Sequence, residues 1–258
     1  MSIFAGKLSD IIRAITGDGV DPHKHFNSAI IVAAGNGVRM GRCNQTKQMT
    51  ELDGIPVVVR TVNAFERCDF IDEIIVVGRA DELCRYAEFA EKYGWKNVKH
   101  VVPGGETRQK SVFEGFKVID DRSEFVIIHD GARCLVTPEI IEKVARQAYI
   151  YGAATAAERA KDTIKKADGS GFIAETIDRS VLWHAQTPQI FKTELYRAAA
   201  YIAAKNGLEA TDDCMLAENL GFKIKLVDCG YENIKITTPD DFDIARAILQ
   251  SRAHRGIK

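Results

Sequence analysis

Residues 28–41 have the sequence SAIIVAAGNGVRMG, in which an apolar run leads directly into a glycine-rich turn. A continuous apolar run bounded by turn residues is typical of a strand that is buried on both faces. Glycines that follow such a strand allow backbone N–H groups to approach a phosphate closely. The stretch therefore predicts a buried strand that ends in an anion-binding loop, with plain turn chemistry as the alternative.

Apolar strands alternate with helical segments along the chain after residue 28. We predict strands at 29–34, 73–78, 98–102, 125–129, 153–157, 223–228 and 233–236, and helices at 57–67, 80–93, 108–118, 138–151, 193–206 and from 239 onward. This alternation indicates an α/β protein with a mainly parallel sheet covered on both faces. Ligands bind such sheets beyond the carboxyl ends of the strands, so we expect the functional residues there.

Residues 161–176 interrupt this alternation. A turn-rich centre at 167–171 lies between two short β-prone runs, which predicts a hairpin that protrudes from a domain spanning 28–252. Because an isolated hairpin is marginal in water, we expect this arm to pack against a second copy in a homodimer. Residues 1–27 are predicted to be an N-terminal extension with a short amphipathic helix, and 253–258 a tail.

The composition excludes several classes of protein. Lys and Arg number 35 against 36 Asp and Glu, and this balance gives no support for the broad basic surface that duplex binding usually needs. The six cysteines form no C-x-x-C pair, so neither a zinc site nor a disulfide scaffold is expected. No apolar run approaches the roughly 20 residues that span a bilayer. We therefore expect a cytoplasmic protein without membrane partners.

Two cations follow the first glycine-rich turn. Arg39 and Lys47 are close enough in sequence to reach the same triphosphate, although two solvated loop charges are the alternative. The dinucleotide motif G-x-G-x-x-G would require glycine at Met40, and the Walker Gly-Lys-Ser/Thr is absent. The loop thus predicts phosphate binding of another type.

Two further strand ends carry polar groups. Residues 104–111, GGETRQKS, form a turn that opens a helix, where Glu106 has helix capping as its simpler explanation. Residues 129–133, HDGAR, place Asp130 and Arg133 at the carboxyl edge of the sheet. Asp130 is suited to a substrate hydroxyl or to Mg²⁺, directly or through water, while a structural ion pair with Arg133 is the alternative.

Seven ordered blocks resemble the 2-C-methyl-D-erythritol 4-phosphate cytidylyltransferase family. They are A-A-G-x-G-x-R-M at 33–40 with Lys47-Gln48, G-G-x-x-R-x-x-S at 104–111, H-D-G-A-R at 129–133, D-T-I-K at 162–165, D-R-S-x-L-W-x-x-Q-T-P-Q at 178–189, T-D-D at 211–213 and N-I-K-I-T-T-P-D-D at 233–241. Ribitol 5-phosphate cytidylyltransferases are similar in several blocks and are one alternative. A non-catalytic nucleotide-binding protein is the other.

The resemblance implies a single Rossmann-like nucleotidyltransferase domain that transfers CMP from CTP to 2-C-methyl-D-erythritol 4-phosphate. The implied products are 4-diphosphocytidyl-2-C-methyl-D-erythritol and pyrophosphate, in isoprenoid precursor biosynthesis. The implied cofactor is Mg²⁺, and the implied assembly is a homodimer with exchanged arms.

The resemblance also implies residue roles. CTP would be bound by Ala33, Ala34, Gly35, Gly37, Gly105, Glu106 and Ser111. Catalytic groups would be Arg39, Lys47, Arg179 and Lys235. The polyol phosphate would be held by Asp130, Arg133, Thr163 and Thr187, assisted by Arg179 and Lys235, with Asp130 also the candidate metal ligand. Thr163 and Arg179 would reach the neighbouring subunit's site. Without the resemblance, Thr187 would be interpreted as a turn residue and Lys235 as an exposed strand lysine.

Overall fold

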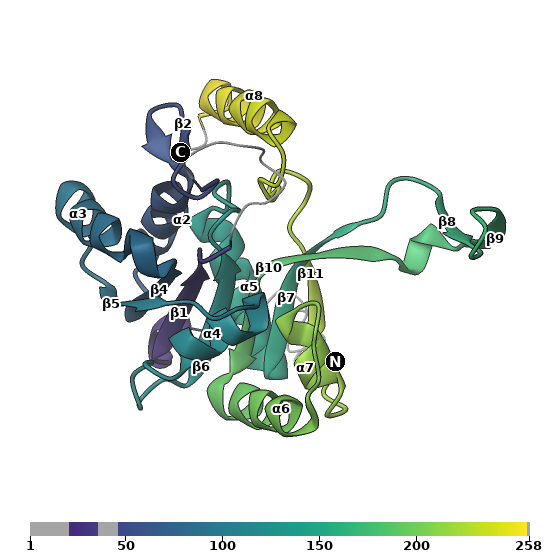
Figure 1. Cartoon of the computed structure of the whole chain (residues 1–258), viewed down its shortest axis with the longest axis horizontal. Helices are drawn as coiled ribbons and strands as arrows, with labels where there is room; N and C mark the ends of the chain where they lie inside the picture. Colours follow the sequence, from purple (N-terminus) through teal and green to yellow (C-terminus); the bar gives the residue numbers. More distant parts are fainter. Residues whose placement is uncertain (1–20, 36–45, 257–258) are drawn as a thin grey trace, which may run out of the picture.

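A seven-stranded sheet forms the centre of the protein (Figure 1). The computed structural model describes residues 21–35 and 46–256. The strands, in spatial order, are β11 (Lys225–Asp228), β7 (Ala153–Arg159), β10 (Trp183–Lys192), β6 (Phe125–Asp130), β1 (Asn27–Val32), β4 (Glu73–Gly78) and β5 (Val98–Pro103). Every neighbouring pair is parallel except those that involve β10, which is antiparallel to β6 and β7. The predicted α/β fold with a mainly parallel sheet is confirmed.

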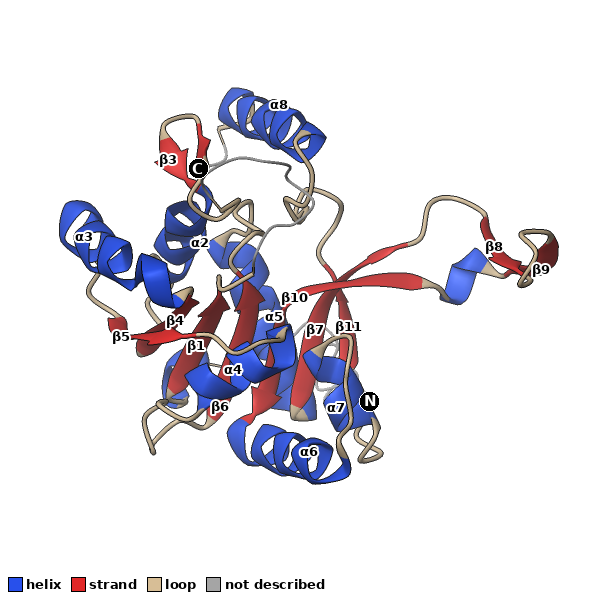
Figure 2. Cartoon of the chain, viewed as in Figure 1, coloured by secondary structure: helices blue, strands red, loops and turns tan. Residues whose placement is uncertain are grey.

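Helices cover both faces of this sheet (Figure 2). Hydrophobic clusters join one face to α2 (Val57–Glu66), α3 (Leu83–Tyr93) and α5 (Pro138–Tyr151), and the other to α4 (Arg108–Phe116), α6 (Thr193–Asn206) and α7 (Asp213–Glu218). A third cluster lies beneath α8 (Asp240–His254), next to the short strands β2 (Glu51–Leu52) and β3 (Ile55–Pro56). The 3-10 turns are η1 (Pro22–Lys24), η3 (Ala80–Glu82) and η4 (Arg179–Val181).

The apolar run that follows Ser28 forms the buried strand β1, as predicted. Side chains of a strand point alternately to opposite faces, so Ile30 packs under α4 and α6 while Ile31 packs under α2 and α5. Both side chains are fully buried. The strand therefore holds the two helical layers together and carries the residues after Val32 to the edge of the sheet.

The predicted hairpin lies outside the main sheet, as β8 (Ile164–Ala167) and β9 (Ile173–Ile177). Figure 1 shows it projecting from the body at the end of two long connections. Its turn is closed by Asp168, whose Oδ1 accepts hydrogen bonds from Ser170 N at 2.9 Å and Phe172 N at 3.0 Å. The arm exposes large apolar side chains, with Phe172 73% and Ile173 67% accessible.

Some predicted elements differ. Residues 233–236 are not a strand, because Ile236 N donates to Ala132 O while Asn233 O accepts from the Arg133 side chain in place of a strand ladder. The helix predicted at 80–93 is divided into η3 and α3. Strand β10 and helix α7 were not predicted; β10 contains buried polar residues and Pro188, which hide its strand character. The predicted N-terminal helix falls outside the described residues.

Helix α4 approaches the sheet closely because Gly115 has no side chain. A Cβ atom there would lie 2.7 Å from Ile30 Cγ2 and 2.8 Å from Val77 Cγ2, which are stiff β-branched side chains in a packed core. This contact fixes the position of α4, whose first turn lines the pocket at the carboxyl ends of the strands.

We predict that Gly115→Val lowers the free energy of unfolding by about 2 kcal/mol through overpacking. The matched control is Gly169→Val in the arm, where nothing lies within 4 Å of an added Cβ, and a change within about 0.5 kcal/mol is expected. Urea denaturation measures both. Equal stability of the two variants would contradict the close packing of α4.

Candidate active site

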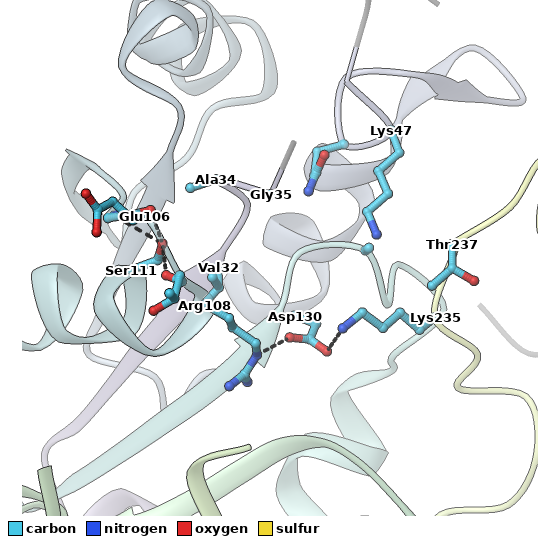
Figure 3. Close-up of a pocket in the computed structure, with 14 residues that line it drawn as sticks. Val32, Ala34, Gly35, Lys47, Glu106, Arg108, Ser111, Asp130, Lys235 and Thr237 are labelled. Carbon is cyan, nitrogen blue, oxygen red and sulfur yellow. Dashed lines mark hydrogen bonds and ion pairs between the residues drawn. The ribbon is translucent and has the colours of Figure 1, made fainter. Parts of the chain in front are cut away.

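A pocket of about 440 Å³ lies at the carboxyl ends of the central strands. It is lined by Val32, Ala34, Gly35, Lys47, Gln48, Gly105, Glu106, Thr107, Arg108, Ser111, Asp130, Ala132, Lys235 and Thr237. Four chain segments meet here: the loops after β1 and β5, the end of β6, and the segment after β11 (Figure 3). The pocket thus occupies the sheet edge where the sequence predicted it.

The loop after β5 makes one wall of the pocket. A Cβ on Gly104 would lie 2.3 Å from Ala34 Cβ, so only glycine fits where the two loops touch. Ser111 Oγ accepts from Gly105 N at 3.2 Å and donates to Thr107 O at 2.9 Å. These bonds fix the backbone of this wall, while Glu106 points to solvent and pairs with Lys110.

Asp130, the last residue of β6, is the central charged group. Its Oδ1 accepts from Arg108 Nε at 2.9 Å and its Oδ2 from Lys235 Nζ at 2.8 Å, with Arg133 Nε 3.7 Å away (Figure 3). Burial alone would raise the pKa of this carboxyl, but the charges of Arg108, Lys235 and Arg133 outweigh burial and hold the pKa well below its usual range. The group is an oriented carboxylate at neutral pH.

Thr187 and Arg133 lie behind Asp130 and are not among the lining residues. Thr187, 3% exposed, accepts a hydrogen bond from Asp130 N at 3.0 Å and contacts His129 Nδ1 at 3.1 Å. Arg133 Nη1 donates to Asn233 O at 2.8 Å. In this structure both residues support the position of Asp130.

Lys47 brings a second ammonium group to the pocket. It is only 9% exposed and lies beside Gln48 at the opposite wall from Ser111 (Figure 3). Of the lining residues, Lys47, Arg108 and Lys235 carry positive charge, whereas Asp130 and Glu106 carry negative charge. Gly37 and Arg39, also predicted here, fall outside the described residues.

Three predicted site residues within the described ranges, Ala33, Thr163 and Arg179, do not line the pocket and have no contact with Asp130 among the hydrogen bonds and ion pairs described above. Ala33 is fully buried behind the pocket wall. Thr163 and Arg179 are exposed on the arm, where Arg179 Nη1 donates to Lys161 O at 2.7 Å. The structure therefore brings Ala34, Gly35, Lys47, Gly105, Glu106, Ser111, Asp130 and Lys235 together in one pocket, without the two arm residues.

Several lining residues were not assigned roles from the sequence. Arg108 and Thr237 lie inside two of the blocks that resemble the family, G-G-x-x-R and N-I-K-I-T-T. Nothing else in the sequence indicated that they line the pocket. Val32, Gln48, Thr107 and Ala132 flank predicted residues, and spacing alone does not distinguish them from ordinary strand, turn and cap positions.

Metal ligands are sparse in the part of the chain that the structure describes. No three His, Cys, Asp or Glu side chains are grouped to hold an ion within residues 21–35 and 46–256. The five cysteines in these ranges are free, and no helix in them is long and apolar enough to cross a membrane.

The sheet topology, the glycine-bordered wall and the cation cluster at the strand ends together define an α/β enzyme of the nucleotidyltransferase class. The chain belongs to the 2-C-methyl-D-erythritol 4-phosphate cytidylyltransferase (IspD) family, whose model matches residues 28–251. The resemblance inferred from the seven sequence blocks is confirmed.

Individual relatives are similar over nearly their whole length. A 2-C-methyl-D-erythritol 4-phosphate cytidylyltransferase of Caldanaerobacter subterraneus is 46% identical over 86% of this chain and 98% of the relative. One of Clostridium acetobutylicum is 44% identical over 88% and 99%. The crystal structure of 4-diphosphocytidyl-2C-methyl-D-erythritol synthase from Anaerococcus prevotii superposes with a TM-score of 0.79, at 36% identity over 88% and 96%.

The fully buried His129 predicts a pH dependence of stability. Burial lowers the pKa of its imidazole to about 3. As the pH falls below about 6.5, the unfolded chain gains a proton that the folded protein does not, so stability decreases. Between about pH 7.5 and pH 5 the loss from this residue is about 2 kcal/mol. We expect His129→Gln to lose less stability over this interval, measured by urea denaturation. If the free energy of unfolding changed equally with pH in the wild type and in His129→Gln, His129 would not be the source of the pH dependence.

Proposed function

We propose that the protein transfers CMP from CTP to 2-C-methyl-D-erythritol 4-phosphate, with pyrophosphate as the second product, in isoprenoid precursor biosynthesis. The observation that carries the proposal is Asp130, held between Arg108 and Lys235 in a pocket that is also lined by Lys47. Membership of the family supports the same activity.

CTP would occupy the side of the pocket bordered by Ala34, Gly35, Gly105 and Ser111. These small residues leave room for a pyrimidine, and the backbone of the Gly105 loop offers polar groups at fixed positions. Ala33, Gly37 and Glu106 are proposed to complete this binding site on the family pattern.

The nucleophile needs no general base. The second pKa of a phosphomonoester is about 6, so the substrate phosphate is already largely dianionic at neutral pH. The barrier lies in bringing this anion to the α-phosphorus while charge develops on the transferred group. Lys47 and Lys235 are therefore proposed to stabilise that charge, together with Arg39 on the family pattern.

The polyol phosphate would lie beside Asp130. A carboxylate that is ionised and fixed can accept a hydrogen bond from a substrate hydroxyl, and Lys235 is close enough to the same carboxylate to contact the substrate as well. Arg133 and Thr187 would act on this side by holding Asp130 in place.

A Mg²⁺ ion fits this arrangement when it is bound mainly by the triphosphate. Mg²⁺ usually keeps several waters and takes one or two carboxylates with phosphate oxygens. Asp130 is the pocket's one inward-facing carboxylate within the described ranges, and its oxygens already accept from Arg108 and Lys235, which suits contact through water. The ion would neutralise charge on the triphosphate and the leaving pyrophosphate.

The two alternatives are less well supported. Both curated relatives carry the erythritol substrate in their names, whereas the ribitol alternative rests on shared sequence blocks alone. A non-catalytic nucleotide-binding protein would have less need of Lys47 and Lys235 in the same pocket.

We predict that the protein releases pyrophosphate from CTP with 2-C-methyl-D-erythritol 4-phosphate and far less with ribitol 5-phosphate. CTP should exceed ATP in kcat/KM by about 100-fold or more, because a site shaped for a pyrimidine does not seat a purine. Phosphorus NMR of the products identifies the new diphosphate linkage. Turnover with ribitol 5-phosphate alone would favour the alternative, and absence of turnover with both would favour a binding protein.

We further propose that the arm, about residues 161–176, joins two copies of a domain spanning 28–252. Its large apolar side chains Phe172 and Ile173 are exposed in a single copy, and Thr163 and Arg179 at its base do not line the pocket of their own chain. These two residues would then serve the partner's site. Residues 1–27 and 253–258 would be an extension and a tail outside this unit.

Mixed dimers test this arrangement. Lys47→Ala and Arg179→Ala homodimers should both have low activity. After dissociation and mixing, a mixed dimer has one site with both wild-type groups, so with half of the dimers mixed about a quarter of wild-type activity should return. Native mass spectrometry establishes that mixed dimers have formed. Formation without any recovery of activity would place Arg179 in the site of its own subunit.

A further inference from the structure

Arg108 connects the pocket to the interior of the protein. It is the first residue of α4, directly after Thr107, whose Oγ1 accepts from Lys110 N and begins the helix. Its side chain runs along the pocket floor and is 27% exposed (Figure 3). It therefore touches the site while it is anchored elsewhere.

The anchor is Asp213, at the start of α7. Arg108 Nη1 donates to Asp213 Oδ2 at 2.6 Å, and the Asp213 side chain is 1% exposed. Asp213 is itself fixed, since Tyr196 Oη donates to its Oδ1 at 2.8 Å and its backbone N donates to Gln189 Oε1 at 3.0 Å. One end of the guanidinium is thus held by a single buried carboxylate, Asp213, which is itself fixed by hydrogen bonds to α6 and β10.

The other end of Arg108 holds the pocket carboxylate. Nε donates to Asp130 Oδ1, while Lys235 donates to Oδ2, so each carboxylate oxygen has its own cation. Lys235 lies on an irregular segment and is partly exposed, whereas Arg108 lies on a packed helix. Of the two cations that donate to Asp130, Arg108 is therefore the one whose position is fixed by a packed helix and a buried carboxylate.

We propose that Arg108 is a positioning residue for CMP transfer: it transmits the fixed geometry of Asp213 to Asp130 and so sets the direction in which Asp130 meets the polyol phosphate. The inference rests on the proposed function for the role of Asp130. Arg108 acts through Asp130 and is distinct from the residues proposed to bind CTP or to stabilise the transferred phosphate.

A structural role for Arg108 must be separated from a positioning role. Removal of Arg108 alone leaves Asp213 buried without its partner, which destabilises the fold whatever the function. Asp213→Asn removes that charge, so the informative comparison is Asp213→Asn against Arg108→Met/Asp213→Asn. The two proteins share a neutral anchor and differ only in the group that holds Asp130.

The double variant should fold, with a thermal midpoint above that of Arg108→Met alone. Relative to Asp213→Asn, its kcat/KM for the polyol phosphate should fall about 30-fold, the effect of one lost charge-assisted hydrogen bond. Its KM for CTP should stay within about 3-fold, because the base-binding wall is intact.

A kcat/KM for the polyol phosphate equal to that of Asp213→Asn would overturn the proposal and leave Arg108 a structural ion pair. Arg108→Gln/Asp213→Asn is the second variant; it keeps a donor without the charge and should change in the same direction. If the wild-type protein itself fails to transfer CMP, the proposed function fails. Crystal structures of the same pair then decide, since an Asp130 carboxylate that keeps its orientation without Arg108 contradicts the inference.

Discussion

The site depends on keeping one carboxylate ionised and oriented at a buried strand end. Burial disfavours the charge of Asp130, so the charge persists because Arg108, Lys235 and Arg133 surround it. Each of these cations comes from a different segment: the start of α4, the chain after β11, and the loop after β6. The sheet brings these segments together, and the ion cluster then fixes their relative positions.

The segment after β11 shows how far this arrangement extends. Asn233 Nδ2 donates to Gln186 Oε1 and Thr187 O, both at 2.9 Å, and Lys235 follows two residues later. Tyr231 lies at the base of the arm, where its hydroxyl donates to Arg159 O at 3.2 Å and Lys161 Nζ lies 3.1 Å from its ring centroid. One short stretch therefore contacts the arm, the back of the site and the pocket, which gives a physical connection between arm position and Asp130.

The sequence predicted those parts that have a local signal. Apolar runs located β1, β4 and β6, and the position of Asp130 directly after such a run predicted its place at the sheet edge. The pattern failed for β10, because its buried Gln186 and Gln189 are satisfied by long-range hydrogen bonds that no local spacing reveals. Arg108 was missed for the same reason: a polar residue in a first helical turn resembles an ordinary solvated one until its two carboxylates are placed.

Local charge also explains how a protein with a net charge of −1 can attract polyanionic substrates. In the cluster, three cations, Arg108, Arg133 and Lys235, face two carboxylates, Asp130 and Asp213, which leaves one positive charge before Lys47 is added. The walls of a pocket of about 440 Å³ confine this excess and focus its field at the sheet edge. A small phosphate can enter that space, whereas a nucleic acid duplex would require a broad basic surface. The cluster that keeps Asp130 ionised thus also supplies the charge that attracts an anion, while the pocket walls limit the size of the anion that reaches it.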